Sequence, residues 1–327
     1  SGADRDKFAG IPTGFNYLDT VLTGLGRSDL IILAARPGMG KTELALKINK
    51  HIAQSVGCAS LIVSLEMSHQ QIGERLLSDT SQLPVDVFDN PDLLSLESIM
   101  DKLRRSAEEY QDLPIYLQEV TNATHVDVCS SVRQFAEEVS NLGLLTIDHV
   151  GLHKTIGTSR VEAVGDMTRA YKMLARELGI PVLLLCQLNR NLEMRDDKRP
   201  MLSDLRESGA IEQDADIVAF IHRPEYYGIN QDENGMPTAG MAEIIIAKHR
   251  NGAVCDVNLR FLKEQARFAD MDDSMLPPAQ ASDSQQAYDD YASGSNGATG
   301  ASAALGSGIG GGEFDLTPRA LDDEAPF

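Results

Sequence analysis

Residues 35–42 read Ala-Arg-Pro-Gly-Met-Gly-Lys-Thr and follow a run of apolar residues. Two glycines in such a loop let backbone N–H groups turn toward phosphate oxygens, and a helix starting directly after the loop adds partial positive charge. Lys41 supplies a full positive charge, and the Thr42 hydroxyl is a ligand for Mg²⁺. The pattern predicts a loop that binds the phosphates of a nucleotide such as ATP through Gly38, Met39, Gly40, Lys41 and Thr42.

One position departs from the usual pattern of such loops. Ala35 stands where the first glycine is common, and an alanine is tolerable there if it ends a strand with negative φ. The alternative interpretation is a glycine-rich turn that merely joins a strand to a helix.

Three polar residues stand at the ends of other predicted strands: Glu66, Asp148 and Gln187. The carboxyl ends of parallel strands share one edge of a sheet, so we expect these side chains near the phosphate loop. Asp148 would hold Mg²⁺ together with Thr42. Glu66 would orient and deprotonate the attacking water, and Gln187 would sense the γ-phosphate. Alternatively, Glu66 is only a charge at a helix N-terminus and Gln187 only caps a turn.

Residues 204–216 are dense in polar groups between apolar anchors. The pair Ser208-Gly209 permits close approach of the backbone to a ligand, and Arg206, followed by Glu207, offers a fork of donors for phosphate. The alternative is a solvated, charged loop.

Residues 248–252 read Lys-His-Arg-Asn-Gly and follow a predicted strand. Lys248 and Arg250 on a rigid turn would suit an arginine finger that reaches the phosphate of a neighbouring subunit. In isolation, the same segment reads as a solvated basic turn.

The elements that must position these residues follow from the hydrophobic pattern. Continuous apolar runs predict strands covered on both faces, and they alternate with helical patterns. This order indicates an α/β protein with a mostly parallel sheet sandwiched by helices, in which the last strands form a hairpin. The strands are expected at 30–35, 60–64, 114–118, 144–147, 182–186, 217–221 and 243–247, and the helices at 41–55, 69–80, 124–141 and 160–178.

Composition limits the class of protein. The 327 residues are 42% hydrophobic and 24% charged, typical of a soluble globular chain. No apolar run approaches the ~20 residues of a membrane span, and no secretory signal is recognised, so we expect a cytoplasmic location and no membrane partner. The four cysteines are widely separated, which favours buried thiols over a zinc or redox site.

The net charge of −20 is unevenly distributed. Residues 270–327 carry eleven acidic residues and one basic residue in a stretch rich in Gly, Ser and Ala. Such a stretch cannot bury enough apolar surface to offset its ordering entropy. We expect a linker remnant at 1–10, a nucleotide-hydrolysing domain at 11–269 and a disordered acidic tail at 270–327.

Together these motifs resemble the C-terminal motor domain of bacterial and phage DnaB-type replicative DNA helicases. The resemblance covers about residues 8–268, and segment 204–216 is its most discriminating part. It rests on segments 35–42, 64–67, 146–148, 187–190, 196–200, 204–216 and 248–252.

The resemblance implies a RecA-like P-loop NTPase core that assembles as a homohexameric ring on single-stranded DNA. It implies that Glu66 is the catalytic base and that Lys248 and Arg250 act on the neighbour's nucleotide. The segment around Arg206, Glu207, Ser208 and Gly209 would line the channel and hold DNA phosphates. A helicase loader and primase are the implied protein partners, although the family's N-terminal helical domain, which binds primase, has no counterpart in this sequence.

Two other classes share the phosphate loop. A RecA-like filament protein or autokinase does not account for segment 204–216. A nucleotide-gated interaction module would recruit partners through its acidic tail without unwinding DNA.

The chain ends Leu-Asp-Asp-Glu-Ala-Pro-Phe. This resembles the acidic tip of bacterial single-stranded-DNA-binding proteins, whose final Phe and carboxylate dock into a basic pocket of partner proteins. A proline, the terminal Phe327 and three acids would suit such a pocket. The alternative is a solubilising acidic tail.

Overall fold

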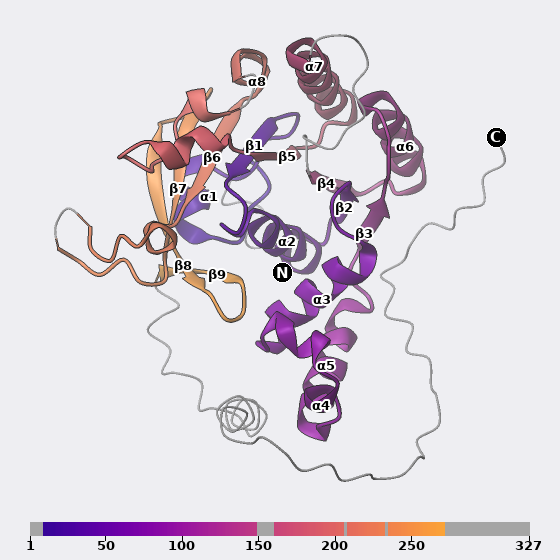
Figure 1. Ribbon diagram of the computed structural model, residues 1–327. Helices are drawn as coiled ribbons and strands as arrows, with labels where there is room; N and C mark the ends of the chain where they lie inside the picture. Colours follow the sequence, from indigo (N-terminus) through magenta and orange to yellow (C-terminus); the bar gives the residue numbers. More distant parts are fainter. Residues whose placement is uncertain (1–8, 149–159, 206–207, 233–234, 272–327) are drawn as a thin grey trace.

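The computed structural model describes residues 9–148, 160–205, 208–232 and 235–271 (Figure 1). Within these residues one sheet has the strand order β3-β2-β4-β5-β1-β6-β7-β8-β9. The six neighbouring strands β3, β2, β4, β5, β1 and β6 are parallel. Strands β7, β8 and β9 extend the sheet beyond β6, and each pairs antiparallel with the strand before it. The strands are β1 (Leu30–Ala35), β2 (Ala59–Ser64), β3 (Ile115–Glu119), β4 (Leu142–Asp148), β5 (Val182–Gln187), β6 (Ile217–His222), β7 (Met241–His249), β8 (Cys255–Leu262) and β9 (Arg267–Asp270).

Helices precede, connect and cover these strands. Two of them begin with reciprocal caps: Ser68 with Gln71, and Thr124 with Asp127, satisfy the free N–H groups of the first turn. The α-helices are α1 (Asn16–Leu22), α2 (Lys41–His51), α3 (His69–Ser81), α4 (Pro91–Leu94), α5 (Glu97–Tyr110), α6 (His125–Glu138), α7 (Arg160–Leu178) and α8 (Ser208–Asp214). A π-helical turn (Ile52–Val56) continues α2, and 3₁₀ turns span Val85–Asp89, Arg190–Met194, Leu202–Asp204 and Pro224–Tyr227.

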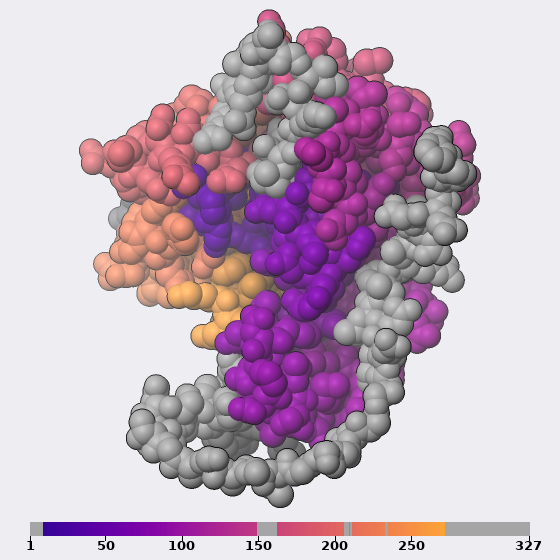
Figure 2. All heavy atoms as spheres, turned by 45° about the vertical axis from the view of Figure 1, so that its right-hand side comes forward, coloured from indigo at the N-terminus to yellow at the C-terminus, as the bar shows by residue number. Residues whose placement is uncertain are grey.

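The sheet is buried on both faces. All six residues of β1 are buried, and they alternate between two apolar clusters. One cluster packs α6 and α7 against the sheet and the other packs α1 and α2. Helices α3 to α5 form a lobe at one end, with a small apolar cluster of their own (Figure 2). The predicted α/β sandwich is therefore confirmed.

All seven predicted strands are present. The last two of them, β6 and β7, pair antiparallel, and the turn after β7 leads into the antiparallel strand β8. One assignment is wrong: β7 extends to His249, so Lys248 lies within the strand and the turn begins at Arg250. Helices α1, α4, α5 and α8 and strands β8 and β9 were not predicted. Segment 204–216 is not a solvated loop, since it contains α8 and both its terminal carboxylates, Asp204 and Asp216, are buried.

Candidate functional site

The phosphate loop connects the end of β1 to the start of α2. Gly38 and Gly40 have φ angles of 78° and 93°, which L side chains rarely adopt. A Cβ at Gly40 would lie 2.8 Å from Cε2 of Phe268 and 3.0 Å from Cε2 of Phe261. Ala35 ends β1 and is not among the positive-φ residues, so the missing first glycine is tolerated as expected.

Lys41, Thr42 and Asp148 converge beside this loop. The Lys41 Nζ lies 2.9 Å from Oδ1 of Asp148, and the Thr42 hydroxyl donates to Oδ2 at 2.6 Å. The Asp148 side chain is 4% exposed and that of Lys41 12%. A hydroxyl and a carboxylate that meet in this way are hard oxygen donors and fit Mg²⁺. The adjacent residues Lys41 and Thr42 thus share one small site with Asp148, which lies 106 positions after Thr42.

Glu66 follows β2 at the same edge of the sheet. The backbone N–H of Leu65 donates to the carbonyl of Asp148 at 2.6 Å, which fixes the start of the Glu66 turn against the end of β4. The Ser64 hydroxyl closes this turn by donating to the carbonyl of Met67 at 2.7 Å and accepting from its N–H at 3.0 Å. Glu66 itself is exposed and lies before the N-cap of α3. This position suits a group that contacts water.

Gln187 is the last residue of β5 and pairs in register with Ala35 of β1. It is exposed, whereas the rest of β5 is buried. The next residue, Leu188, donates its N–H to the carbonyl of Ala35 at 3.0 Å. Gln187 therefore lies directly beside the start of the phosphate loop.

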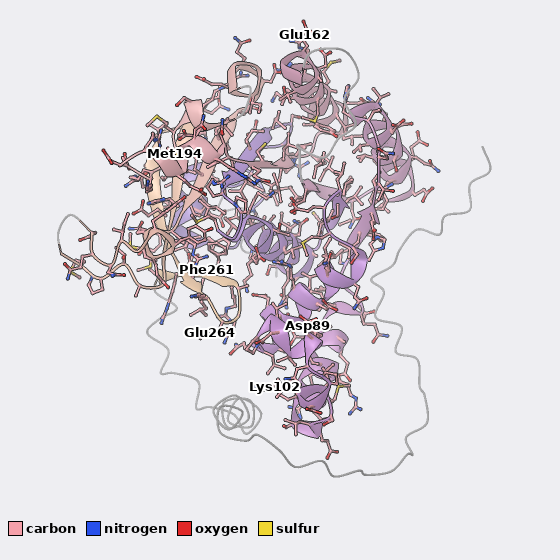
Figure 3. All side chains as sticks on the ribbon, in the orientation of Figure 1. Asp89, Lys102, Glu162, Met194, Phe261 and Glu264 are labelled. Atoms are coloured by element: carbon pink, nitrogen blue, oxygen red, sulfur yellow. The ribbon has the colours of Figure 1, made fainter. Side chains whose placement is uncertain are left out.

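Sequence reasoning missed Arg223, which follows β6 at this edge. Its Nη1 donates to the carbonyl of Gly38 at 3.0 Å, and its guanidinium lies 3.7 Å from the ring centroid of Phe261, labelled in Figure 3. Burial lowers the pKa of Arg223. The ring of Tyr226 approaches to 3.4 Å from the position of a Cβ at Gly38. The rule that located Asp148 and Gln187, a polar residue directly after a buried strand, points to His222 after the predicted strand 217–221, and Arg223 is the next residue.

A second missed cation is Arg75 on α3. It forms an ion pair with Glu43 of α2. Burial lowers the pKa of Arg75, and the negative charge of Asp148 raises it. The edge that holds the phosphate loop therefore contains cations from α2, α3 and the segment after β6.

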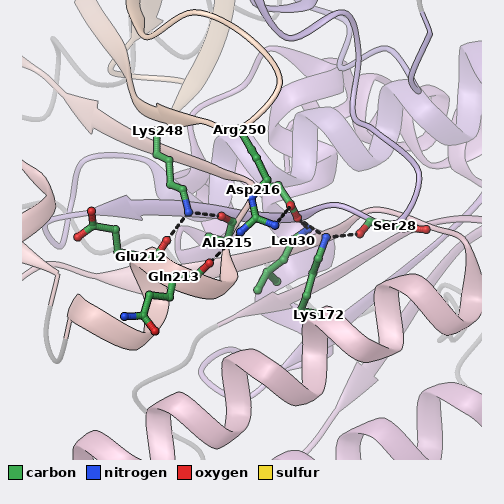
Figure 4. Close-up of polar contacts among 9 residues, drawn as sticks. All are labelled: Ser28, Leu30, Lys172, Glu212, Gln213, Ala215, Asp216, Lys248 and Arg250. Carbon is green, nitrogen blue, oxygen red and sulfur yellow. Dashed lines mark hydrogen bonds and ion pairs between the residues drawn. The ribbon is translucent and has the colours of Figure 1, made fainter.

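Lys248 and Arg250 lie at the opposite edge of the sheet, near the start of β6. Figure 4 shows both side chains beside the residues that end α8. Strand β7 runs antiparallel to β6, so His249 pairs with Ile217 at the start of β6. The Lys248 Nζ donates to the carbonyls of Glu212 and, at 2.6 Å, Ala215. Burial lowers the pKa of Lys248, and the positive charge of Arg250 lowers it further. Both cations bind the carboxyl end of α8, where backbone carbonyls lack helical partners.

The predicted DNA-binding segment is partly described. Arg206 and Glu207 lie outside the described residues, as do 1–8 of the predicted linker remnant and 272–327 of the predicted tail. Ser208 begins α8, and a Cβ at Gly209 would meet no atom within 4 Å. The backbone at Gly209 is therefore accessible to a ligand.

Other chemistries find little support in the described residues. They contain no group of three His, Cys, Asp or Glu side chains able to hold a metal ion, and no helix long and apolar enough to cross a membrane. Burial raises the pKa of Cys129 to about 11 and that of Cys186 to about 12. The prediction of buried thiols is confirmed for these two, whereas Cys58 and Cys255 are partly exposed.

Comparison with known proteins places this geometry among helicase domains. The family model of the DnaB-like helicase C terminal domain matches residues 10–270. The chain is 41% identical over 283 residues to the replicative DNA helicase DnaB of Geobacillus stearothermophilus, covering 84% of this chain and 61% of that protein. It is 40% identical over 281 residues to the replicative DNA helicase DnaC of Bacillus subtilis, covering 84% and 60%. The chain thus spans about three fifths of the length of these curated relatives.

Two solved structures have the same fold. The ATPase domain of G40P superimposes with a TM-score of 0.75 at 33% identity, covering 82% of this chain and 94% of that one. A DnaB-like replicative helicase, described with its interactions with primase, gives a TM-score of 0.74 at 33% identity, covering 82% and 64%. The RecA-like fold expected from the sequence is confirmed.

Proposed function

The chain belongs to the DnaB-like helicase C-terminal domain family, and on this premise we propose that it is an ATP-driven motor that unwinds DNA at the replication fork. One observation carries the proposal beyond family membership. The groups suited to nucleotide chemistry are divided between two opposite edges of one sheet. A site divided in this way is completed when the phosphate-loop edge of one copy packs against the opposite edge, which carries Lys248 and Arg250, of the next copy.

The first half of the proposed site binds the nucleotide. Lys41 and the N–H groups between Gly38 and Gly40 hold the phosphates, because they bring positive charge to the start of α2. Thr42 and Asp148 would hold Mg²⁺, which when bound neutralises charge on the phosphate oxygens.

Two polar groups beside the loop complete the chemistry within the chain. Glu66 accepts a proton from the attacking water, since its carboxylate is exposed beside the Asp148 strand. Gln187 donates an amide N–H to the γ-phosphate from the end of β5. Arg223 and Tyr226 flank the loop and provide a surface for the nucleotide.

The second half of the proposed site acts on the neighbour. The six residues of β1 rise about 3.3 Å each, so the two edges are separated by about 20 Å. Arg250 lies at the edge where β1 begins, and no arginine side chain spans that length. It therefore reaches a phosphate only in an adjacent copy, together with Lys248. Repeated head-to-tail contact of this type closes a ring, which we propose to be a homohexamer.

DNA binding is assigned to residues 206–209 in the centre of the ring. Arg206 binds the phosphate backbone, so sequence preference is small and binding weakens with salt. Arg206→Ala should reduce affinity for oligo(dT) and reduce the slope of log affinity against log salt by about one. The control is Arg104→Ala, which removes an exposed arginine from α5 in the remote lobe. Equal losses in the two variants would contradict this assignment.

The function is tested by ATPase rate with and without oligo(dT), measured alongside particle mass and electron microscopy. We expect rings whose turnover rises with DNA and falls by orders of magnitude in Lys41→Ala. Helical filaments would indicate a recombinase-type protein instead. Nucleotide binding without strand displacement would indicate an interaction module.

We further propose that the motor works in the cytoplasm with a helicase loader and primase. Primase is the partner named with one of the solved relatives. Co-purification of tagged primase with this chain, compared with the tag alone, tests whether residues 9–271 contribute to that contact.

A further inference from the structure

Asp216 joins three separate elements through one buried carboxylate (Figure 4). Its side chain is 5% exposed. Oδ2 accepts from the backbone N–H of Leu30 at 2.8 Å and from the Nζ of Lys172 on α7. Oδ1 lies 3.3 Å from Nη1 of Arg250. The carboxylate therefore connects the start of β1, helix α7 and the turn after β7, directly after the end of α8.

Arg250 is held at three points. Its backbone N–H donates to the carbonyl of Asp216 at 2.8 Å, and its Nη2 donates to the carbonyl of Gln213 at 2.9 Å. The ion pair with Asp216 is the third contact and the only charged one among them. The Arg250 side chain nevertheless remains 46% exposed. Its guanidinium is thus oriented from one side and open on the other.

The negative charge of Asp216 serves Arg250 in a way that the carbonyls do not. A guanidinium bound only to neutral carbonyls rotates about a flexible stem, whereas a buried carboxylate of opposite charge selects one rotamer. Leu30 and Lys172 hold that carboxylate in turn. Leu30 begins β1, the strand that ends in the phosphate loop. Through Asp216 and Leu30, the position of Arg250 is therefore coupled to the strand that carries the chain's own phosphate loop.

We propose that Asp216 is a positioning residue for Arg250, holding the guanidinium in the geometry that the neighbouring subunit's nucleotide requires. This inference rests on the proposed trans role of Arg250. It also ties the finger to DNA, because α8 begins directly after 206–207 and its last carbonyls bind Lys248 and Arg250. A displacement of the DNA segment that moves α8 therefore changes the support of Arg250.

The test is Asp216→Asn in the full chain, because asparagine keeps an acceptor for Leu30 and removes the charge. We expect kcat for ATP to fall by about ten- to a hundredfold, because a misplacement of about 1 Å can cost about a hundredfold, with KM changed less than about twofold and the rings intact. Stimulation by oligo(dT) should fall further than the basal rate. The control is Asp79→Asn. Asp79 also pairs with two cations, Lys47 and Lys50, so removal of its charge should leave kcat within about twofold of the parent value.

A double-mutant cycle with Arg250→Gln separates positioning from general damage. If Asp216 acts through Arg250, then Asp216→Asn lowers kcat in the parent chain but adds no further loss in the Arg250→Gln background. Equal losses in both backgrounds would overturn the proposal. If Asp216→Asn alone fails to fold, Lys172→Met is added, because it removes the lysine that would lose its carboxylate partner. The same cycle is then measured in the Lys172→Met background, with Lys172→Met as the reference.

The outcomes distinguish this inference from the proposed function. Unchanged or increased kcat in Asp216→Asn, with turnover of Arg250→Gln reduced but measurable, refutes the positioning role and leaves the helicase proposal standing. Normal turnover in Arg250→Gln refutes the trans role of Arg250 and the inference with it. Reduced kcat that depends on Arg250 supports both.

Discussion

Replacing Gly40 by alanine should damage the phosphate loop more than the same change at another left-handed glycine. At φ 93° an alanine is strained by about 1–2 kcal/mol. Its Cβ would also lie 2.8 Å from the Phe268 ring. That ring packs edge-to-face on Phe261 at 4.9 Å in the core, so it has little room to move. Overpacking of this kind costs about 1–3 kcal/mol.

Gly57 provides the matched control. Its φ is 71°, but a Cβ there would meet no atom within 4 Å, so Gly57→Ala carries the strain alone. The lower entropy of the unfolded alanine chain offsets about 0.4–1 kcal/mol in both variants. We expect the free energy of unfolding to fall by about 1–4.5 kcal/mol for Gly40→Ala and by about 0–1.5 kcal/mol for Gly57→Ala.

Urea titration of both variants measures the difference, and thermal melts with Mg²⁺ and a non-hydrolysable ATP analogue measure ligand binding. Nucleotide should raise the Tm of the parent chain and of Gly57→Ala but not of Gly40→Ala, because only the latter shifts the loop N–H groups. Equal destabilisation of the two variants, or an unchanged ligand shift in Gly40→Ala, would refute the steric reasoning.

Three further predictions concern the base, the pH dependence and the tail. Glu66→Gln should bind ATP normally but lose turnover, and normal hydrolysis in single-turnover assays would assign the base elsewhere. Burial lowers the pKa of His222 to about 4, below its unfolded value of about 6.5, so the unfolded chain binds the proton more readily. The free energy of unfolding should therefore fall by about 1–3 kcal/mol as pH drops from 6.5 toward 4. Thermal melts at pH 7 and pH 5 should show a smaller loss of stability in His222→Phe than in the parent chain. An equal loss in the two proteins would contradict this prediction. A peptide of the last seven residues should bind proteins that read single-stranded-DNA-binding-protein tails and lose binding without Phe327, whereas binding that follows only total charge would reduce the tail to non-specific electrostatics.

One edge of the candidate site could be predicted from the sequence because the positions of its residues depend on a local rule. Asp148, Glu66 and Gln187 each stand at or just after the end of a parallel strand, and such ends meet wherever the sheet is parallel. The convergence of Lys41 and Thr42 on Asp148 follows from this rule alone. Family resemblance was not needed for it.

The opposite edge could not be located in this way. Whether Arg250 lies beside the phosphate loop or about 20 Å from it depends on β7 running antiparallel to β6, which is a tertiary choice. The same holds for Asp216, whose contacts come from residues 186 positions earlier, at Leu30, and 44 earlier, at Lys172. Local pattern left a solvated, charged loop open as the alternative interpretation of its surroundings, and it could not indicate the distant partners that bury Asp216.

The division of the site between two subunits is tested most directly by mixing two inactive variants. Arg250→Ala retains the phosphate loop, and Lys41→Ala retains the finger, so a mixed ring contains some contacts in which both halves are intact. With equal amounts and random assembly, about a quarter of the contacts are of this kind. Native mass spectrometry would verify mixed rings, and the account predicts ATPase well above that of either variant alone, up to about a quarter of the parent rate if contacts act independently. Verified mixed rings with no more activity than the separate variants would contradict it.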